Sequence, residues 1–171
     1  MKNQQEMVSS RCSVMVVAVI LMMTGCAKFG GGTDYLRQAA QYEQQGKYRQ
    51  ALAAYKKAVA AHPQRAEVYH RLGYLYQFLG KNVQAEEAYL KAIDCDHGYV
   101  DSYVNLGALY FKDGWIQRGQ RILEDALEVN PKAYYAHLNV GHIFFEKKEY
   151  GEARAHFEAA LAAVPDDPIA L

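Results

Sequence analysis

The sequence is poor in cysteine, proline and tryptophan, and it has no excess of charge of one sign. Its 171 residues include three cysteines, four prolines and one tryptophan, and 19 basic residues balance 19 acidic ones. A net charge of zero argues against a surface built for nucleic acid or another polyanion. The few prolines, and the many alanines, tyrosines, leucines, glutamines and glutamates after residue 34, indicate an all-helical chain. The length suits one domain with a modest core.

The patterns that mark common catalytic and metal sites are also missing. The six histidines include no pair at i and i+4, and no Cys-x-x-Cys occurs. The glycines at 30–32 are not followed by the lysine of a phosphate-binding loop. Ser102 is the only serine after residue 13, and it lies in no nucleophile motif. We therefore expect no enzymatic activity, no metal and no cofactor.

Residues 1–25 have the order of a secretory signal peptide. Basic Lys2 and Arg11 precede a ten-residue apolar run at 14–23, and small residues follow it. The run is too short to cross a bilayer as a helix, which takes about 20 residues. An uncleaved signal anchor is the alternative interpretation.

The end of this segment, Met23-Thr-Gly-Cys26, resembles the lipobox of bacterial lipoproteins. The resemblance implies cleavage before Cys26 and acylation of that cysteine, and two or more chains give stable membrane attachment. Residues 26–33 would then be the acylated cysteine and a flexible tether. Ala27 stands where Asp would favour the inner membrane, so we expect an outer-membrane anchor facing the periplasm.

After residue 34 the sequence repeats every 34 residues. Equivalent positions carry side chains of similar size at i, i+3, i+4 and i+7, which is one face of a helix. These columns are Tyr35, Tyr69, Tyr103, His137; Gln38, Leu72, Leu106, Val140; Ala39, Gly73, Gly107, Gly141; and Tyr42, Tyr76, Tyr110, Phe144. A turn column follows, with Gly46, Gly80, Gly114 and Lys148. Lysine departs from the glycine that ends a helix at low cost, so the fourth turn is predicted to be strained or differently shaped.

The second half of each unit carries a small residue, a bulky one and an alanine before a closing proline or histidine. These are Ala51, Ala85, Gly119, Ala153; Tyr55, Tyr89, Leu123, Phe157; Ala58, Ala92, Ala126, Ala160; and Pro63, His97, Pro131, Pro165. The whole order, W-x2-L-G-x2-Y, then A-x3-F, then P, resembles the tetratricopeptide repeat.

This resemblance implies an all-α, right-handed α-solenoid of about four helix–turn–helix units. The units are 34–63, 64–97, 98–131 and 132–165, and the tail is 166–171. The predicted helices are 34–45, 48–61, 65–79, 82–95, 99–112, 116–129, 133–147 and 150–163. The tail is too short for a covering helix, so we expect it either to fold back or to leave an end that pairs with a second copy or a partner.

The resemblance places the first helix of each unit on a concave face. Candidate contacts there are Arg37, His70, Arg71, Tyr74, Phe78, Asn105, Phe111, Asn139, His142 and Phe145. Asparagine can bond both polar groups of a peptide backbone, and arginine can hold a carboxylate bidentately. The alternative is that the asparagines bond neighbouring backbone and the aromatics pack between repeats. The lysine and asparagine columns of the family's carboxylate clamp hold other residues here, so that clamp is not expected.

Together these features predict a membrane-anchored periplasmic scaffold that binds a peptide or helix of an envelope protein. The layout resembles lipoproteins that assist assembly of a pilus or a secretion complex. An accessory subunit of a cell-wall or polysaccharide-export enzyme, or a small-ligand carrier using His70, Tyr74 and His142, is the alternative. Trp115, which follows a turn glycine, is either an exposed anchor or a lid on its helical hairpin. Cys95 is expected to be a buried thiol, with an intermolecular bridge as the alternative.

Overall fold

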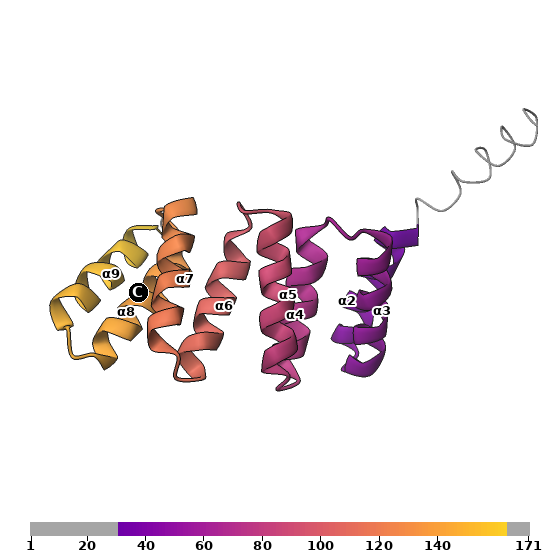
Figure 1. The fold of residues 1–171 in the computed structure, drawn as a ribbon, viewed down its shortest axis with the longest axis horizontal. Helices are drawn as coiled ribbons and strands as arrows, with labels where there is room; N and C mark the ends of the chain where they lie inside the picture. The colour runs from indigo at the N-terminus through magenta and orange to yellow at the C-terminus, as the bar shows by residue number, and fades with distance from the viewer. Residues whose placement is uncertain (1–30, 164–171) are drawn as a thin grey trace, which may run out of the picture.

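The structure is a computed structural model that describes residues 31–163, and within this range the chain forms eight α-helices and no strand. The helices are α2 (Gly31–Gln44), α3 (Tyr48–Ala61), α4 (Ala66–Phe78), α5 (Asn82–Cys95), α6 (Val100–Lys112), α7 (Ile116–Val129), α8 (Tyr134–Glu146) and α9 (Tyr150–Ala163). They stand side by side as four antiparallel pairs (Figure 1). No helix in this range is both long and apolar enough to cross a membrane.

The helix boundaries agree closely with those predicted from the 34-residue period. The largest difference is at the first helix, which begins at Gly31 instead of residue 34. Residues 31–33, predicted to be the end of a flexible tether, are therefore helical. Asp34 lies in the first turn of α2, where a carboxylate is favoured by the helix dipole. The predicted signal peptide, Cys26 and the tail 166–171 lie outside the described residues.

The small residue in each first helix lets the second helix of the same unit pack closely. A Cβ atom added at Gly73 would lie 2.8 Å from the ring of Tyr89, and one at Gly107 would lie 2.5 Å from Leu123. At Gly141 the added atom would lie 2.6 Å from Phe157. These separations are shorter than any carbon contact tolerates, so the glycines are required by packing, as the repeat pattern predicted.

The turn between the two helices of every unit passes through the left-handed region of the backbone. Gly46, Gly80 and Gly114 have φ angles of 69°, 70° and 82°. Lys148 takes the same place in the fourth unit with φ 65°. The fourth turn therefore has the shape of the other three, and a side chain occupies a conformation that costs roughly 1–2 kcal/mol for residues other than glycine. The prediction of strain at this turn is confirmed.

The buried side chains form two clusters, which are joined by Ile93 and Ile122, partly buried against both. The first includes Tyr55, Leu75, Tyr89 and Leu109 from the first three units, and the second is built around Leu123, Val140 and Ile143. Each helix packs mainly on the helices before and after it in the chain. Such a stack has no contacts between distant units.

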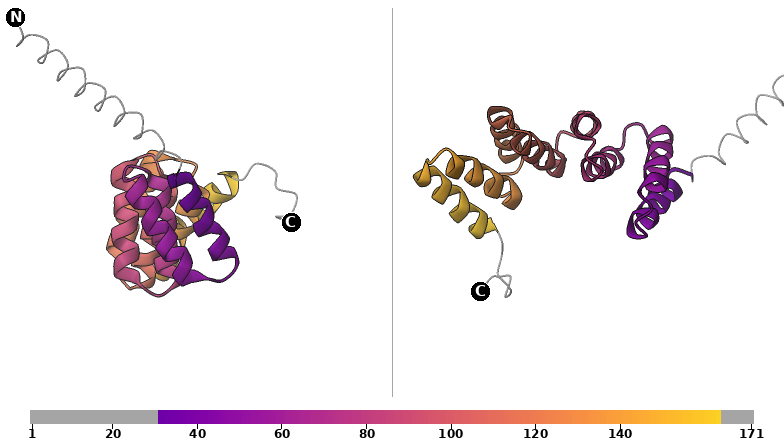
Figure 2. Two further views of the ribbon diagram at one scale, coloured as in Figure 1. Left: turned by 90° about the vertical axis from the view of Figure 1, so that its right-hand side faces the viewer. Right: turned by 90° about the horizontal axis from the view of Figure 1, so that it is seen from below.

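The pairs follow a curved path, which Figure 2 shows in the view from below. The first helices of successive units touch directly, α4 with α6 and α6 with α8, whereas no comparable contact joins the second helices within the described range. The first helices therefore form the inner row of the curve, as the family resemblance implied.

Candidate functional site

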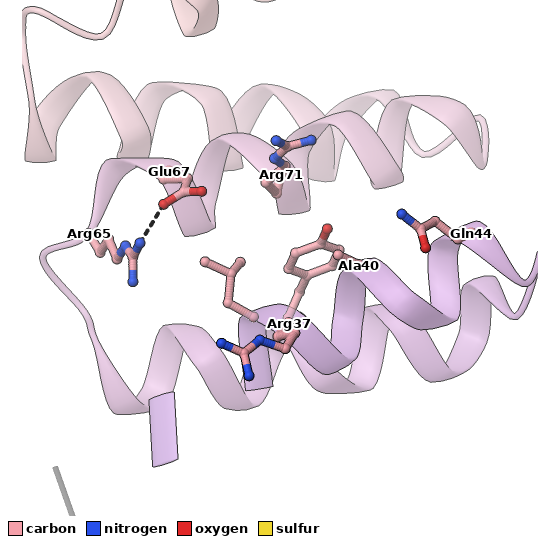
Figure 3. A pocket seen from close by; sticks show the side chains of 8 residues that line it. Arg37, Ala40, Gln44, Arg65, Glu67 and Arg71 are labelled. Carbon is pink, nitrogen blue, oxygen red and sulfur yellow. Dashed lines mark hydrogen bonds and ion pairs between the residues drawn. The ribbon is translucent and has the colours of Figure 1, made fainter. Parts of the chain in front are cut away.

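Two hollows lie along the inner row of helices. The first has a volume of about 380 Å³ and lies mainly between α2 and α4 (Figure 3). It is lined by Leu36, Arg37, Ala40, Gln44, Tyr55, Arg65, Glu67 and Arg71. Three guanidinium groups and one carboxylate line this hollow, and the carboxylate of Glu43 accepts a hydrogen bond from the Tyr55 hydroxyl at 2.8 Å, so positive charge is in excess there.

Only one of the three arginines in this first hollow is paired. Arg65 Nη2 lies 2.6 Å from Glu67 Oε2, and this ion pair neutralises the single acid of the hollow. Arg37 on α2 and Arg71 on α4 are exposed, stand on opposite walls, and form no ion pair within residues 31–163. Two unpaired guanidiniums from adjacent units suit a carboxylate or another anionic group.

The second hollow has a volume of about 260 Å³ and lies where α4, α6 and α8 meet. It is lined by His70, Asp101, Val104, Asn105, Tyr135 and Asn139. Asp101 is exposed and has no ion-pair partner among the described residues. Two side-chain amides and a tyrosine ring that is 66% exposed complete the polar wall.

His70 forms the floor of the second hollow rather than a free contact. Its Nδ1 atom lies 3.1 Å from the hydroxyl oxygen of Ser102, which is fully buried. The rings of Tyr99 and Tyr89 lie 5.1 Å and 5.8 Å from the imidazole. Burial lowers the pKa of His70, and the nearby carboxylate of Asp101 opposes that shift only in part. The imidazole is therefore neutral at pH 7, and Asp101 carries the charge of this hollow.

The structure divides the residues predicted to line the groove. Arg37 and Arg71 line the first hollow, and His70, Asn105 and Asn139 line the second. Tyr74, which is 49% exposed, lines neither of them.

The remaining four aromatic candidates pack against their own neighbours. Phe78 lies 4.7 Å from the ring of Tyr48, and Phe145 lies 5.6 Å from that of Tyr150. Phe111 is partly buried against the second core cluster. His142 meets Phe157 edge-on at 5.4 Å. None of these four side chains lines either hollow.

Sequence reasoning missed six polar or aromatic residues of the hollows, namely Gln44, Tyr55, Arg65, Glu67, Asp101 and Tyr135. Three of them, Glu67, Asp101 and Tyr135, are spaced by 34 residues and precede the Arg71, Asn105, Asn139 column by four. On a helix, residues four apart share a face. This column was therefore visible in the repeat and could have been added to the concave face.

Two further residues singled out from the sequence lie away from the hollows. Trp115 is 47% exposed and stacks on Tyr110, with ring centroids 5.8 Å apart. Both of its interpretations thus hold in part, since the ring stacks on its own hairpin and is still about half exposed. Cys95 is half-buried, and its Sγ lies 3.7 Å from the carbonyl oxygen of Pro63. Within residues 31–163 no three side chains of His, Cys, Asp or Glu are grouped to hold a metal ion.

Comparison with known families and structures agrees with this architecture. Models described as tetratricopeptide repeat match residues 66–96 and 104–168, and one described as TPR repeat matches residues 40–80. A comparison with curated protein sequences finds no match.

Among solved structures, MamA has a TM-score of 0.70 at 25% identity and covers 77% of each chain. PilF of Pseudomonas aeruginosa has a TM-score of 0.71 at 21% identity, over 84% of this chain and 65% of PilF. The first TPR of Spaghetti (RPAP3), bound to the HSP90 peptide SRMEEVD, has a TM-score of 0.65 at 23% identity, over 70% of this chain and 94% of that one.

Proposed function

The chain belongs to the tetratricopeptide repeat family, whose members are generally interaction scaffolds, and from that premise we propose that its inner face binds an extended segment of another protein. The observation that carries the proposal is the pair of polar hollows on the inner row of helices, each built from adjacent units. Polar side chains in both hollows have donor or acceptor atoms that could bond a partner. The inner row of helices that carries them is concave. Because this surface is formed before the partner binds, less conformational entropy is lost on binding.

The chemistry of the two hollows supports a peptide as the occupant. Asn105 and Asn139 each carry one acceptor oxygen and two donor hydrogens, which match the C=O and N–H of an extended backbone. Arg37 and Arg71 offer paired donors to a carboxylate. Because amide contacts to the backbone are independent of sequence, the charged groups would select the partner.

Substitution of the groove residues, followed by recovery of partners, tests this proposal. Full-length protein would be crosslinked in its native membranes and purified, and the captured proteins would be compared between variants. Combining Arg71→Ala with Asn105→Ala and Asn139→Ala should abolish capture of the specific partner, since each side chain is exposed or half-buried and is not part of the core. The matched control is Arg154→Ala on α9, an exposed residue far from the hollows in the sequence. Equal recovery of all partners by both variants would contradict a role of the inner face.

We further propose that the protein is a lipoprotein whose acylated Cys26 anchors it to the outer membrane, with the folded part in the periplasm. The support is the order of basic residues, short apolar run and Met23-Thr-Gly-Cys26. From Cys26 to the start of α2 there are five residues, which reach at most about 18 Å. The array would therefore lie close to the membrane surface, in a position to assist assembly of a pilus or secretion complex.

Metabolic labelling tests the anchor separately from the groove. Cells grown with labelled palmitate should incorporate label into the wild-type chain and not into Cys26→Ala. The variant should also move from the membrane fraction to the soluble fraction. Label that persists in Cys26→Ala would place the acylation elsewhere and refute this anchor without touching the groove.

A further inference from the structure

The two hollows of the inner row differ in charge, although they are built from equivalent positions of the repeat. Glu67 and Arg71 of the second unit correspond to Asp101 and Asn105 of the third, 34 residues later. In the first hollow the acid is held by Arg65 at 2.6 Å, and Arg37 and Arg71 have no ion-pair partner in the part of the chain that the structure describes. In the second hollow asparagines replace the arginines, and the carboxylate of Asp101 has no ion-pair partner among residues 31–163.

The second hollow has the chemistry of a cation site. Asp101 supplies a formal negative charge, and the amide oxygens of Asn105 and Asn139 can accept hydrogen bonds from an ammonium or guanidinium group. The exposed ring of Tyr135 offers a face for a cation–π contact. Val104 can pack against the aliphatic stem of a lysine or arginine. His70 adds no opposing charge, because burial lowers its pKa and its Nδ1 is engaged with Ser102.

We propose that the groove selects a bipolar peptide, which places an acidic group in the hollow between α2 and α4 and a lysine or arginine side chain at Asp101 and Tyr135. This inference rests on the proposed peptide-binding function and specifies the charge pattern of the partner. A peptide with two acids would set one of them against Asp101, and a peptide with two bases would set one against Arg37 and Arg71. Both mismatches place like charges together in a partly desolvated groove.

The architecture also sets the spacing between the two charges. The groups that would hold the two charges lie two units apart along the inner row, because Arg37 and Arg71 are on α2 and α4, whereas Asp101 and Tyr135 are on α6 and α8. Adjacent packed helices are 8–10 Å apart, so two steps span roughly 16–20 Å. An extended chain rises about 3.3 Å per residue, so the acid and the base should be separated by about five or six residues.

Synthetic peptides provide the test. The probes are acetylated and amidated serine–threonine–alanine peptides that carry Glu and Lys six positions apart in either order, with Glu–Glu and Lys–Lys peptides as references. Binding to the full chain in detergent would be measured by fluorescence anisotropy at low salt. Of the two peptides that carry one Glu and one Lys, the tighter binder should bind on the order of tenfold more tightly than the Glu–Glu or the Lys–Lys peptide. This difference in affinity should shrink as the salt concentration is raised.

A charge reversal identifies the hollow responsible. Asp101→Lys should transfer the preference from the Glu–Lys peptide to the Glu–Glu peptide. Asp94→Lys makes the same change of net charge at an exposed residue of α5 outside both hollows, and it should leave the preference unchanged. Circular dichroism would verify that both variants remain helical.

The outcomes separate this inference from the function on which it rests. If the reference peptides bind the wild-type chain as tightly as the Glu–Lys peptides, or if Asp101→Lys does not move the preference, the bipolar pattern is refuted while peptide binding stands. If no peptide binds at millimolar concentration, both the peptide-binding function and the charge pattern fail. A second readout uses Nα-acetyl-lysine N-methylamide, which keeps a free ε-ammonium group. It should shift the side-chain amide signals of Asn105 and Asn139 in an NMR spectrum. An absence of any shift at these amides would also refute the cation site.

Discussion

Nδ1 of His137 on α8 lies 3.1 Å from Nδ1 of His156 on α9. The other nitrogen of His137, Nε2, lies 3.1 Å from the carbonyl oxygen of Pro131, which can only accept a hydrogen bond. Nε2 therefore carries a proton, and in the neutral ring Nδ1 accepts from the N–H of His156. The pair can take up one further proton and keep this hydrogen bond. A second further proton would put an N–H on both Nδ1 atoms, which face each other.

This pair and His70 predict that the fold loses stability as the pH falls below neutral. Burial lowers the pKa of His156, with a further contribution from His137, and burial also lowers that of His70. The unfolded chain, with histidine pKa values near 6.5, then binds more protons than the folded chain at mildly acidic pH. The free energy of unfolding should therefore decrease from pH 7.5 to pH 5.5, as measured by urea denaturation. His156→Phe should make the decrease smaller, and Ala155→Gln on the same helix should not; an unchanged decrease in His156→Phe would contradict the assignment.

Gly119→Ala should destabilise the array by about 1–3 kcal/mol. The added Cβ would lie 2.9 Å from the carbonyl oxygen of Gly107 and 3.2 Å from the backbone nitrogen of Phe111, and neither backbone atom can move without shifting a helix. Gly151→Ala is the matched control, because its Cβ would meet nothing within 4 Å. Because alanine has less backbone freedom than glycine in the unfolded chain, Gly151→Ala should instead stabilise the protein by about 0.5–1 kcal/mol. Thermal unfolding of both variants tests the contrast, and equal effects would refute the close approach of α6 and α7.

Lys148→Gly should stabilise the protein by about 1 kcal/mol, because glycine adopts the left-handed backbone of the fourth turn without strain. Lys148→Ala keeps a Cβ atom while removing the charge, so it should not show this gain. A comparison of the two variants by denaturant titration separates the backbone effect from the loss of the ammonium group. A gain of equal size in both would assign the effect to charge.

Trp115 should be quenched by a neutral quencher such as acrylamide to an extent between that of a buried and a free indole. One face of its ring stacks on Tyr110, and the Arg118 guanidinium carbon lies 4.5 Å from the ring centroid. Arg118→Ala should increase the quenching of the folded chain, because it uncovers the indole. The single tryptophan makes the signal unambiguous. Quenching of the wild type as strong as that of the urea-unfolded chain would show that the stack does not persist in solution.

The sequence was most informative where the repeat constrains the backbone. A 34-residue period with glycine at positions such as Gly73 and Gly114 predicted the helices, their turns and the close crossing within each unit, because each of these features depends on local size and backbone conformation. The beginning of α2 was missed because glycines 31 and 32 favour loops by propensity, whereas the structure continues the helix through them.

The candidate site was only partly predictable, because it depends on how side chains from different units meet. The column of Arg37, Arg71, Asn105 and Asn139 was found from helical periodicity, and the structure places it along both hollows. Phe145 follows the 34-residue period and Phe78 lies one position beyond it, yet the two rings pack on Tyr150 and Tyr48, since an aromatic ring at a helix end reaches the neighbouring turn. Pairing of His137 with His156, 19 residues apart, follows no periodic rule and required the coordinates.

Because each helix packs mainly on the helices next to it in the chain, the array has the mechanics of a spring. Small rotations at the junctions between units add along the stack to open or tighten its arc. A chain that spans both hollows would couple these junctions and stiffen the arc. Tension on a captured strand would in turn be spread over the whole solenoid instead of falling on one joint.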